Sequence, residues 1–210
     1  MISKRRKIAV LGGAGLIGSY LVEYLIKKKH NVVVIDDFSK GKKDNLKKVI
    51  NKIDIRCIDL EKKKNLHNVL KDCNIFFHQA SRAYGVGYST NNHTKILSHN
   101  EKITNNLISS LDKIKVDYFQ CVSSSCVYDD NGPKKISEEI YPKGKPEKAN
   151  LGYGIAKRLL EKKIMLSSKR LKFPLSIVRP FNIYSERYNW VGQNSQAIPM
   201  IVKKIMESDK

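Results

Sequence analysis

Tyr153 and Lys157 have the residue types and the spacing of an acid/base pair. They form a Y-x-x-x-K pattern at the start of a stretch with helical apolar spacing that runs to about Leu171, and side chains four residues apart lie on one face of a helix. A cationic lysine near a phenol favours the phenolate, so the tyrosine can act as a base near neutral pH. The alternative for Tyr153 is a half-buried aromatic residue on an amphipathic helix, because the pattern also arises by chance.

A second reactive segment, Ser123-Ser124-Ser125-Cys126, closes the apolar run 116–123, which predicts a buried strand. Strand ends in open α/β sheets face the ligand crevice. One of the serines at this place, Ser123, Ser124 or Ser125, can hold a substrate hydroxyl against the tyrosine. Cys126 is either an acid/base in the crevice or a small buried hydrophobic residue.

A glycine pattern, G-x-x-G-x-x-G at Gly12, Gly15 and Gly18, lies between the predicted strand 7–11 and the predicted helix 16–29. Glycine permits a tight turn and a close backbone approach to a pyrophosphate, which then faces the helix N-terminus. The alternative is a glycine turn that only packs the helix on the strand. The strand–loop–helix context favours a dinucleotide site.

Two acidic residues follow the next two predicted strands. Asp36 ends the run 31–35, and a carboxylate there accepts hydrogen bonds from ribose hydroxyls and repels a 2′-phosphate, which favours NAD over NADP. Asp59 follows the strand 53–58 and either bonds the adenine amino group or caps a helix, while Leu60 packs beside the adenine ring.

The elements that must position these residues alternate between strands and helices. Further strands are predicted at 74–78 and 175–179, and further helices at about 90–113 and 198–207. Alternation of this kind is the βαβ signature. The predicted fold class is therefore α/β, a Rossmann-type doubly wound parallel sheet with helices on both faces.

Composition excludes several classes of protein. The formal net charge is +20, but most of the 40 basic residues are lysines spread along the chain, which favours a solvated enzyme surface over a nucleic-acid binder. Four scattered cysteines do not form a disulfide framework or a zinc motif, so no metal is expected. The sequence contains no apolar stretch of about 20 residues and no signal-peptide pattern, so we expect a cytoplasmic protein without membrane partners.

The ordered motifs resemble the extended short-chain dehydrogenase/reductase family over nearly the whole chain. They are the glycine loop, Asp36, Asp59-Leu60, His78-Gln79-Ala80-Ser81, Asn100-x-x-x-Thr104-x-Asn106-Leu107, Ser123 to Tyr128, Tyr153-x-x-x-Lys157 and Arg179 to Tyr184. The resemblance implies an NAD-dependent nucleotide-sugar epimerase or dehydratase, and a homodimer is plausible on the same basis. It implies cofactor contacts at Gly12, Gly15, Leu16, Ile17, Gly18, Asp36, Asp59, Leu60, Gln79, Ala80, Ser81, Asn100, Tyr153 and Lys157, and substrate contacts at Gly87, Ser125 and Asn182.

Within that family, the segment from Gly85 to His93 and the Ser-x-Cys-x-Tyr step from Ser124 are similar to GDP-mannose 3,5-epimerases and GDP-fucose synthases. In both groups the cysteine is an acid/base next to a transient ketone, which implies that role for Cys126 and a GDP-linked hexose as substrate. Val191 and Gln196 stand where those groups carry a second proton shuttle. Simple C4 oxidation and reduction, or 4,6-dehydration, therefore stays open.

The predicted organisation is one Rossmann domain over 1–210, in which about 181–210 begin a substrate lobe. Members of the family continue for about another hundred residues, the size of a separate lobe. The alternative function is a catalytically impaired NAD-binding protein or a partner subunit, because water exclusion and positioning supply much of an enzyme's rate.

Overall fold

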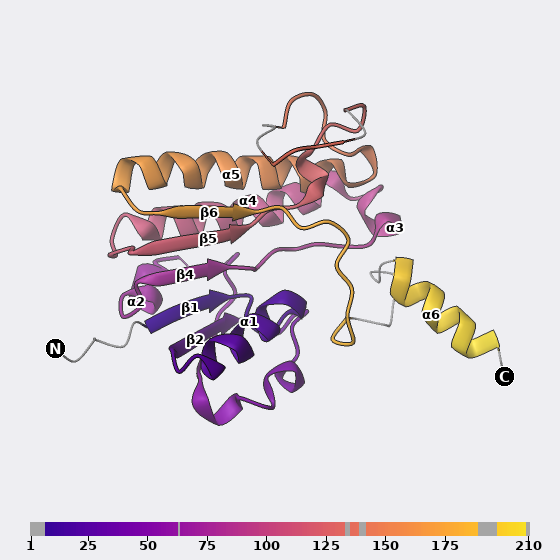
Figure 1. Cartoon of the computed structure of the whole chain (residues 1–210). Coiled ribbons are helices and arrows are strands. Elements are labelled where there is room, and N and C mark those ends of the chain that lie inside the picture. The colour runs from indigo at the N-terminus through magenta and orange to yellow at the C-terminus, as the bar shows by residue number, and fades with distance from the viewer. Residues whose placement is uncertain (1–6, 63, 133–134, 139–141, 189–196, 209–210) are drawn as a thin grey trace. The chain divides into compact units, whose positions relative to one another are not determined.

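A six-stranded parallel sheet forms the centre of the fold in the computed structural model, which describes residues 7–62, 64–132, 135–138, 142–188 and 197–208. Its strand order is β3-β2-β1-β4-β5-β6 (Figure 1). The strands are β1 (Lys7–Leu11), β2 (Asn31–Asp36), β3 (Asp54–Cys57), β4 (Ile75–His78), β5 (Tyr118–Val122) and β6 (Leu175–Val178). This order confirms the predicted doubly wound Rossmann-type sheet.

The helices follow from the same topology. They are α1 (Leu16–Lys27), α2 (His67–Leu70), α3 (Val86–Ser89), α4 (His93–Leu111), α5 (Leu151–Leu171) and α6 (Ala197–Ser208). Strands are added in one direction from β1 to β3 and in the other from β4 to β6. Because βαβ crossovers are right-handed, α1 lies on one face of the sheet, and residues 102–111 of α4 and 163–171 of α5 lie on the other.

The central strands β1, β2, β4 and β5 are mostly apolar and largely buried, whereas the edge strands β3 and β6 contain no buried residue. Residues 8–11 of β1 and 32–36 of β2 are all buried. On the α1 face, the core cluster includes Ile8, Val10, Ala14, Val22, Leu25, Val32, Val34, Leu46 and Val49. Phe76 of β4 and Phe119 of β5 stack with ring centroids 6.2 Å apart. This burial explains why short continuous apolar runs marked the strands in the sequence.

Element boundaries differ from the sequence predictions mainly at their ends. The strand predicted at 7–11 has those bounds, whereas β5 covers 118–122 rather than 116–123, and α4 begins at His93 rather than near Thr90. The short helices α2 and α3 and the 3₁₀ turns η1 (Lys43–Leu46), η2 (Ile50–Lys52), η3 (Ser125–Val127) and η4 (Lys148–Asn150) were not predicted. Four-residue helices carry too little periodicity to be recognised.

The chain divides into two compact units that are each discontinuous in sequence. Unit 1 consists of Met1–Ser81, Lys102–Val122 and Lys163–Val178. Unit 2 consists of Arg82–Glu101, Ser123–Lys162 and Arg179–Lys210. The sheet belongs to unit 1, and the segments that follow β4, β5 and β6 belong to unit 2. Among the described residues, no helix is both long enough and apolar enough to span a membrane.

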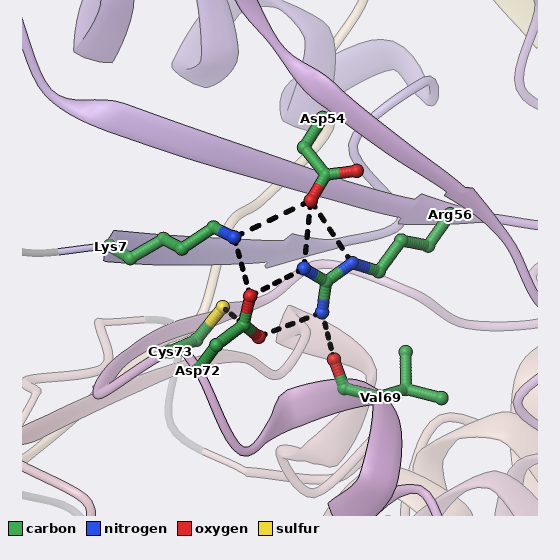
Figure 2. A network of polar contacts seen from close by, with 6 residues as sticks. All are labelled: Lys7, Asp54, Arg56, Val69, Asp72 and Cys73. Carbon is green, nitrogen blue, oxygen red and sulfur yellow. Dashed lines mark hydrogen bonds and ion pairs between the residues drawn. The ribbon is translucent and has the colours of Figure 1, made fainter.

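An ion-pair network ties the amino ends of two strands to the end of α2 in unit 1 (Figure 2). Asp72 accepts hydrogen bonds from Lys7 on β1 and from Arg56 on β3, whose guanidinium reaches both carboxylate oxygens at 2.8 and 2.6 Å. Arg56 also pairs with Asp54 at 2.7 Å and donates to the carbonyl of Val69. The network therefore links strands that are not adjacent in the sheet.

Replacing Asp72 with asparagine should destabilise the protein at pH 7 by about 1 kcal/mol or less, because the carboxylate is 40% exposed and screened by water. Hydrogen bonds from Arg56, and then from Lys7, lower the pKa of Asp72 in the folded state. A lowered pKa gives stability that is present above the unfolded value near 4 and is lost as the pH falls further. Urea unfolding should show the difference from wild type shrinking below about pH 4; a constant difference at pH 3 would contradict this reading.

Candidate functional site

The glycine loop of unit 1 leaves no room for side chains at two of its three glycines. Gly12 has a φ of 78°, and a Cβ there would lie 2.6 Å from the backbone nitrogen of Ala80. A Cβ on Gly18 would lie 2.1 Å from the carbonyl oxygen of Gly12. The packing of β1, α1 and the segment after β4 therefore requires these two glycines. This agrees with the alternative interpretation, in which the glycine turn packs the helix on the strand.

Gly15 has a different role, since its Cβ would meet only the Gly12 carbonyl oxygen, at 3.3 Å. Gly15 is the N-cap of α1 and offers no side-chain cap, while Leu16 is half-buried and Ile17 is exposed. The first backbone N–H groups of a helix have no partner within the helix and attract anions. A loop that lacks a Cβ at this turn leaves room for the pyrophosphate of a dinucleotide, so the packing role of Gly12 and Gly18 is compatible with the predicted dinucleotide site, which stays a prediction.

Asp36 is buried at the end of β2 and accepts two backbone hydrogen bonds. The N–H of Ala14 donates to Oδ2 and the N–H of Phe38 to Oδ1, each at 2.9 Å. The carboxylate thus lies against the glycine loop, at the carboxyl end of its strand. That is the place expected for a ribose contact, and the contact itself stays a prediction.

Asp59 and Leu60 come directly after β3. Oδ1 of Asp59 accepts a hydrogen bond from the N–H of Glu61 at 2.9 Å, so this aspartate caps a turn rather than a helix. Leu60 is buried, and its carbonyl accepts a hydrogen bond from Asn106 on α4 at 2.9 Å. The contacts of Asp59 and Leu60 with adenine stay a prediction.

Gln79, Ala80 and Ser81 follow β4 in unit 1. Ala80 lies against Gly12, as the close approach at that glycine requires. Nε2 of Gln79 donates to Gln120 at 2.8 Å, and its buried Oε1 has no hydrogen-bond partner within the described part of the chain. A buried amide oxygen of this kind is suited to accept a hydrogen bond from a ligand.

In unit 2, Ser124 and Cys126 are fixed by a 3₁₀ turn that follows β5. Ser124 is the N-cap of η3, and its Oγ accepts the N–H of Cys126 at 3.2 Å. The N–H of Ser125 donates to the carbonyl of Pro180 at 3.0 Å. Oγ of Ser123 is buried without a hydrogen-bond partner among the described residues. The turn holds the serines and the cysteine in fixed positions relative to one another.

Tyr153 and Lys157 lie one turn apart on α5, with the lysine Nζ 5.5 Å from the centre of the tyrosine ring. The chain carries a second Y-x-x-x-K pair with almost the same geometry, since Nζ of Lys28 lies 5.6 Å from the ring of Tyr24 on α1. The two pairs differ in burial: Lys157 is 3% exposed, whereas Lys28 is exposed. A buried cation acts more strongly on its neighbour than a solvated one, which singles out the pair on α5.

Cys126 lies beside the same part of α5. A Cβ on Gly154, the residue after Tyr153, would lie 2.5 Å from the carbonyl oxygen of Cys126 and 2.7 Å from the Cβ of Pro146. The next residue, Glu147, accepts a hydrogen bond from the Cys126 thiol. Burial, and then this carboxylate, raise the pKa of Cys126 to about 11. The cysteine is therefore a protonated thiol at neutral pH, suited to donate a proton.

Alkylation of Cys126 by iodoacetamide should be slow at pH 7 and should rise with pH toward about 11, because the thiolate is the nucleophile. Glu147→Gln should move the rise to lower pH, since it removes the negative charge next to the thiol. Peptide mapping by mass spectrometry measures each cysteine separately, and exposed Cys57 serves as the internal reference. Equal rates for Cys126 and Cys57 at pH 7 would contradict the assignment.

Three further predicted residues lie in unit 2. Asn100 is buried on α4, and its side chain holds the backbone of Arg82 through bonds of 2.9 and 3.0 Å, so it fixes the segment after β4. Gly87 lies in α3, where a Cβ would meet nothing within 4 Å, so packing does not require glycine there. Asn182 is exposed after β6. Val191 and Gln196, the positions of the expected proton shuttles, lie outside the described residues.

Sequence reasoning missed a buried ion pair that braces unit 2. Arg179 donates to both carboxylate oxygens of Glu161 at 2.8 and 2.7 Å and to the Tyr128 hydroxyl at 3.1 Å. Glu161 is 1% exposed and follows Lys157 by four residues on α5. The pair joins the helix of the Tyr–Lys pair to the segments after β5 and β6. The available sequence signal was the acidic residue Glu161, which lies four residues after Lys157 and so on the same face of the helix.

Tyr188 was also missed. Burial, and then the charge of Tyr153, raise the pKa of Tyr188 to about 12. This phenol therefore stays protonated at neutral pH.

Comparison with known proteins agrees with this arrangement. The family model described as "NAD dependent epimerase/dehydratase family" matches residues 8–210. The chain is 29% identical to a UDP-N-acetyl-alpha-D-glucosaminuronate decarboxylase of Bacillus cytotoxicus, over 98% of this chain and 63% of the relative. It is also 29% identical to a putative UDP-glucose 4-epimerase of Methanocaldococcus jannaschii, over 96% of this chain and 63% of the relative.

Among solved structures, a UDP-glucuronic acid 4-epimerase of Bacillus cereus, in complex with UDP-glucuronic acid and NAD, is 25% identical. It has a TM-score of 0.80, and the match covers 96% of this chain and 63% of that one. The chain thus spans 63% of the length of the relatives compared here. It belongs to the NAD-dependent epimerase/dehydratase family, whose cofactor is NAD.

Proposed function

We propose that this chain takes part in the epimerisation or dehydration of a nucleotide-linked hexose through transient oxidation at C4. The observation that carries the proposal is the Tyr153–Lys157 pair on α5, in which a buried lysine contacts the phenol ring. An acid/base pair of this kind removes and returns the proton of an alcohol. Ser124, Cys126 and the glycine loop supply the other parts that such a reaction needs.

The glycine loop and the first turn of α1 would hold the pyrophosphate of NAD through Gly12, Gly15, Leu16, Ile17 and Gly18. Asp36 would bind the adenosine ribose, with Asp59 and Leu60 at the adenine, and Gln79, Ala80, Ser81 and Asn100 along the rest of the dinucleotide. The open space at Gly15, where a Cβ would meet only the Gly12 carbonyl oxygen, supports this assignment. When bound, NAD supplies the hydride acceptor and donor for C4 of the sugar.

Tyr153 would remove the proton from the sugar 4-hydroxyl as the general base, and Ser124 would hold that hydroxyl in line. Lys157 is buried with its Nζ 5.5 Å from the centre of the Tyr153 ring, so its charge lies close to the hydroxyl that takes part in the reaction. Tyr153 then returns the proton when the 4-keto group is reduced. Gly87, Ser125 and Asn182 would contact the substrate.

Cys126 would exchange a proton at the carbon next to the 4-keto group, where the neighbouring carbonyl makes the C–H bond acidic. Its raised pKa favours delivery of a proton over removal, since the resting group is a thiol. The proposal also concerns which nucleotide the sugar carries. The Ser-x-Cys-x-Tyr step favours GDP, while the relatives named above act on UDP-linked sugars, so tests include both.

Calorimetric titration of the wild-type chain should show NAD binding at least about tenfold more tightly than NADP, a difference of about 1.4 kcal/mol. The reason is that Asp36, the last residue of β2, and the adjacent Asp37 place two carboxylates at the end of this strand, and these repel a 2′-phosphate. Equal affinity for the two dinucleotides would contradict the ribose assignment. NAD binding that no nucleotide sugar alters would support the alternative, a catalytically impaired NAD-binding protein or partner subunit.

A further inference from the structure

Ala14, in the middle of the glycine loop, is held through both of its backbone polar groups. Its N–H donates to Asp36 at 2.9 Å. Its carbonyl accepts two hydrogen bonds, from the N–H of Lys42 at 3.2 Å and from Nδ2 of Asn45 at 2.9 Å. Asn45 is thus a side chain outside the predicted dinucleotide motif that bonds directly to the loop.

The two donors to this carbonyl come from the segment 38–46, which follows β2 and includes η1. Gly41 is buried against the loop, and a Cβ there would lie 2.8 Å from the carbonyl carbon of Ala14. Leu46, the residue after Asn45, is fully buried in the core cluster beneath α1. Leu46 therefore anchors the segment in the core, and Gly41 packs it against the glycine loop. These two contacts fix the direction of the Asn45 amide.

The Ala14 carbonyl belongs to the same peptide group as the N–H of Gly15. That N–H donates to the carbonyl of Gly12 at 3.2 Å, so the peptide is held at both ends. Gly15 is the N-cap of α1, and the next two residues supply the uncapped N–H groups. The orientation of this one peptide thus sets the start of the helix that faces the pyrophosphate.

We propose that Asn45 is a positioning residue for the dinucleotide site, acting through the Ala14–Gly15 peptide. The inference rests on the proposed binding of NAD by the glycine loop. Asn45 does not touch the cofactor in this proposal. Its amide keeps the loop in the conformation that receives the pyrophosphate, so that binding does not have to order the loop.

Asn45→Asp tests this role, because aspartate has the same shape but sets an acceptor against the Ala14 carbonyl. We expect NAD affinity to fall about tenfold to a hundredfold, as removal of one partner of a partly buried hydrogen bond predicts. Amide hydrogen exchange should become faster in peptides covering 11–18, with or without NAD. Asn51→Asp, on exposed η2, makes the same chemical change away from the loop and should match wild type.

The outcomes separate positioning from general stability and from the proposed function. Asp72→Asn weakens the protein elsewhere and should leave NAD affinity and loop exchange unchanged. If Asn45→Asp does not fold, Asn45→Ala removes the donor without a charge and should show the same direction. If the Asn45 variants bind NAD as tightly as wild type and exchange the amide hydrogens of 11–18 at the wild-type rate, the inference is wrong. A wild-type chain that does not bind NAD would defeat the proposed function, while the exchange rates would still decide whether Asn45 orders the loop.

Discussion

Replacing Arg179 with methionine should destabilise the protein by about 3 kcal/mol, the lower end of the usual effect of breaking a buried ion pair, because the Arg179 side chain is 16% exposed. The variant leaves the Glu161 carboxylate, 1% exposed, without the two hydrogen bonds of 2.8 and 2.7 Å that it accepts from the guanidinium. Methionine fills a similar volume, so the loss reports charge rather than a cavity. The free energy of unfolding from urea titration, followed by circular dichroism, measures the effect.

A double variant separates the charge from the packing. Arg179→Met combined with Glu161→Leu removes both charges, and replacing a whole buried pair with apolar residues is often close to neutral. The double variant should therefore recover most of the lost stability, although the bond to the Tyr128 hydroxyl stays lost. If the double variant is as unstable as the single one, the pair is not what braces these segments.

Tyr153→Phe should lower nucleotide-sugar-dependent NADH formation by about 10²- to 10⁴-fold, the range for loss of a general base. Phenylalanine keeps the ring against which Lys157 packs, so only the hydroxyl is lost. Binding of NAD should persist, because the glycine loop and Asp36 belong to unit 1. Single-turnover absorbance measures the rate, and calorimetry measures the affinity.

The chain contains its own control for this experiment. Tyr24→Phe changes the same residue type in the second Y-x-x-x-K pair, in which Tyr24 on α1 and Lys28, the C-cap of α1, are both exposed. This variant should form NADH at the wild-type rate. Unchanged turnover in Tyr153→Phe, or equal losses in the two variants, would remove Tyr153 from the mechanism.

Local sequence patterns predicted the parts of the fold that depend on local physics. The run Lys7–Leu11 is buried on both sides, so its apolar composition gave the bounds of β1 correctly. The glycine loop was recognisable because the positive φ of Gly12 and the close approaches at Gly12 and Gly18 require glycine. The Y-x-x-x-K pattern alone was insufficient, since the pair on α1 shares it, and only burial separates the two.

Contacts between distant segments could not be predicted. Asn45 meets Ala14 across 31 residues, and Arg179 meets Glu161 across 18, with no spacing rule that links them. The hydrogen bond from Cys126 to Glu147 is likewise set by the packing of Gly154 on the cysteine backbone. Such pairs depend on how the elements pack, which periodicity does not encode.

The most direct test of the central claim is to mix the purified chain with NAD and then with UDP- or GDP-linked hexoses while recording NADH absorbance. The account predicts that one nucleotide sugar produces NADH bound to the protein, and that Tyr153→Phe suppresses the signal. The sugar that responds would also decide between UDP and GDP. Absence of NAD binding, or sugar-dependent NADH that is unaffected in Tyr153→Phe, would contradict the account.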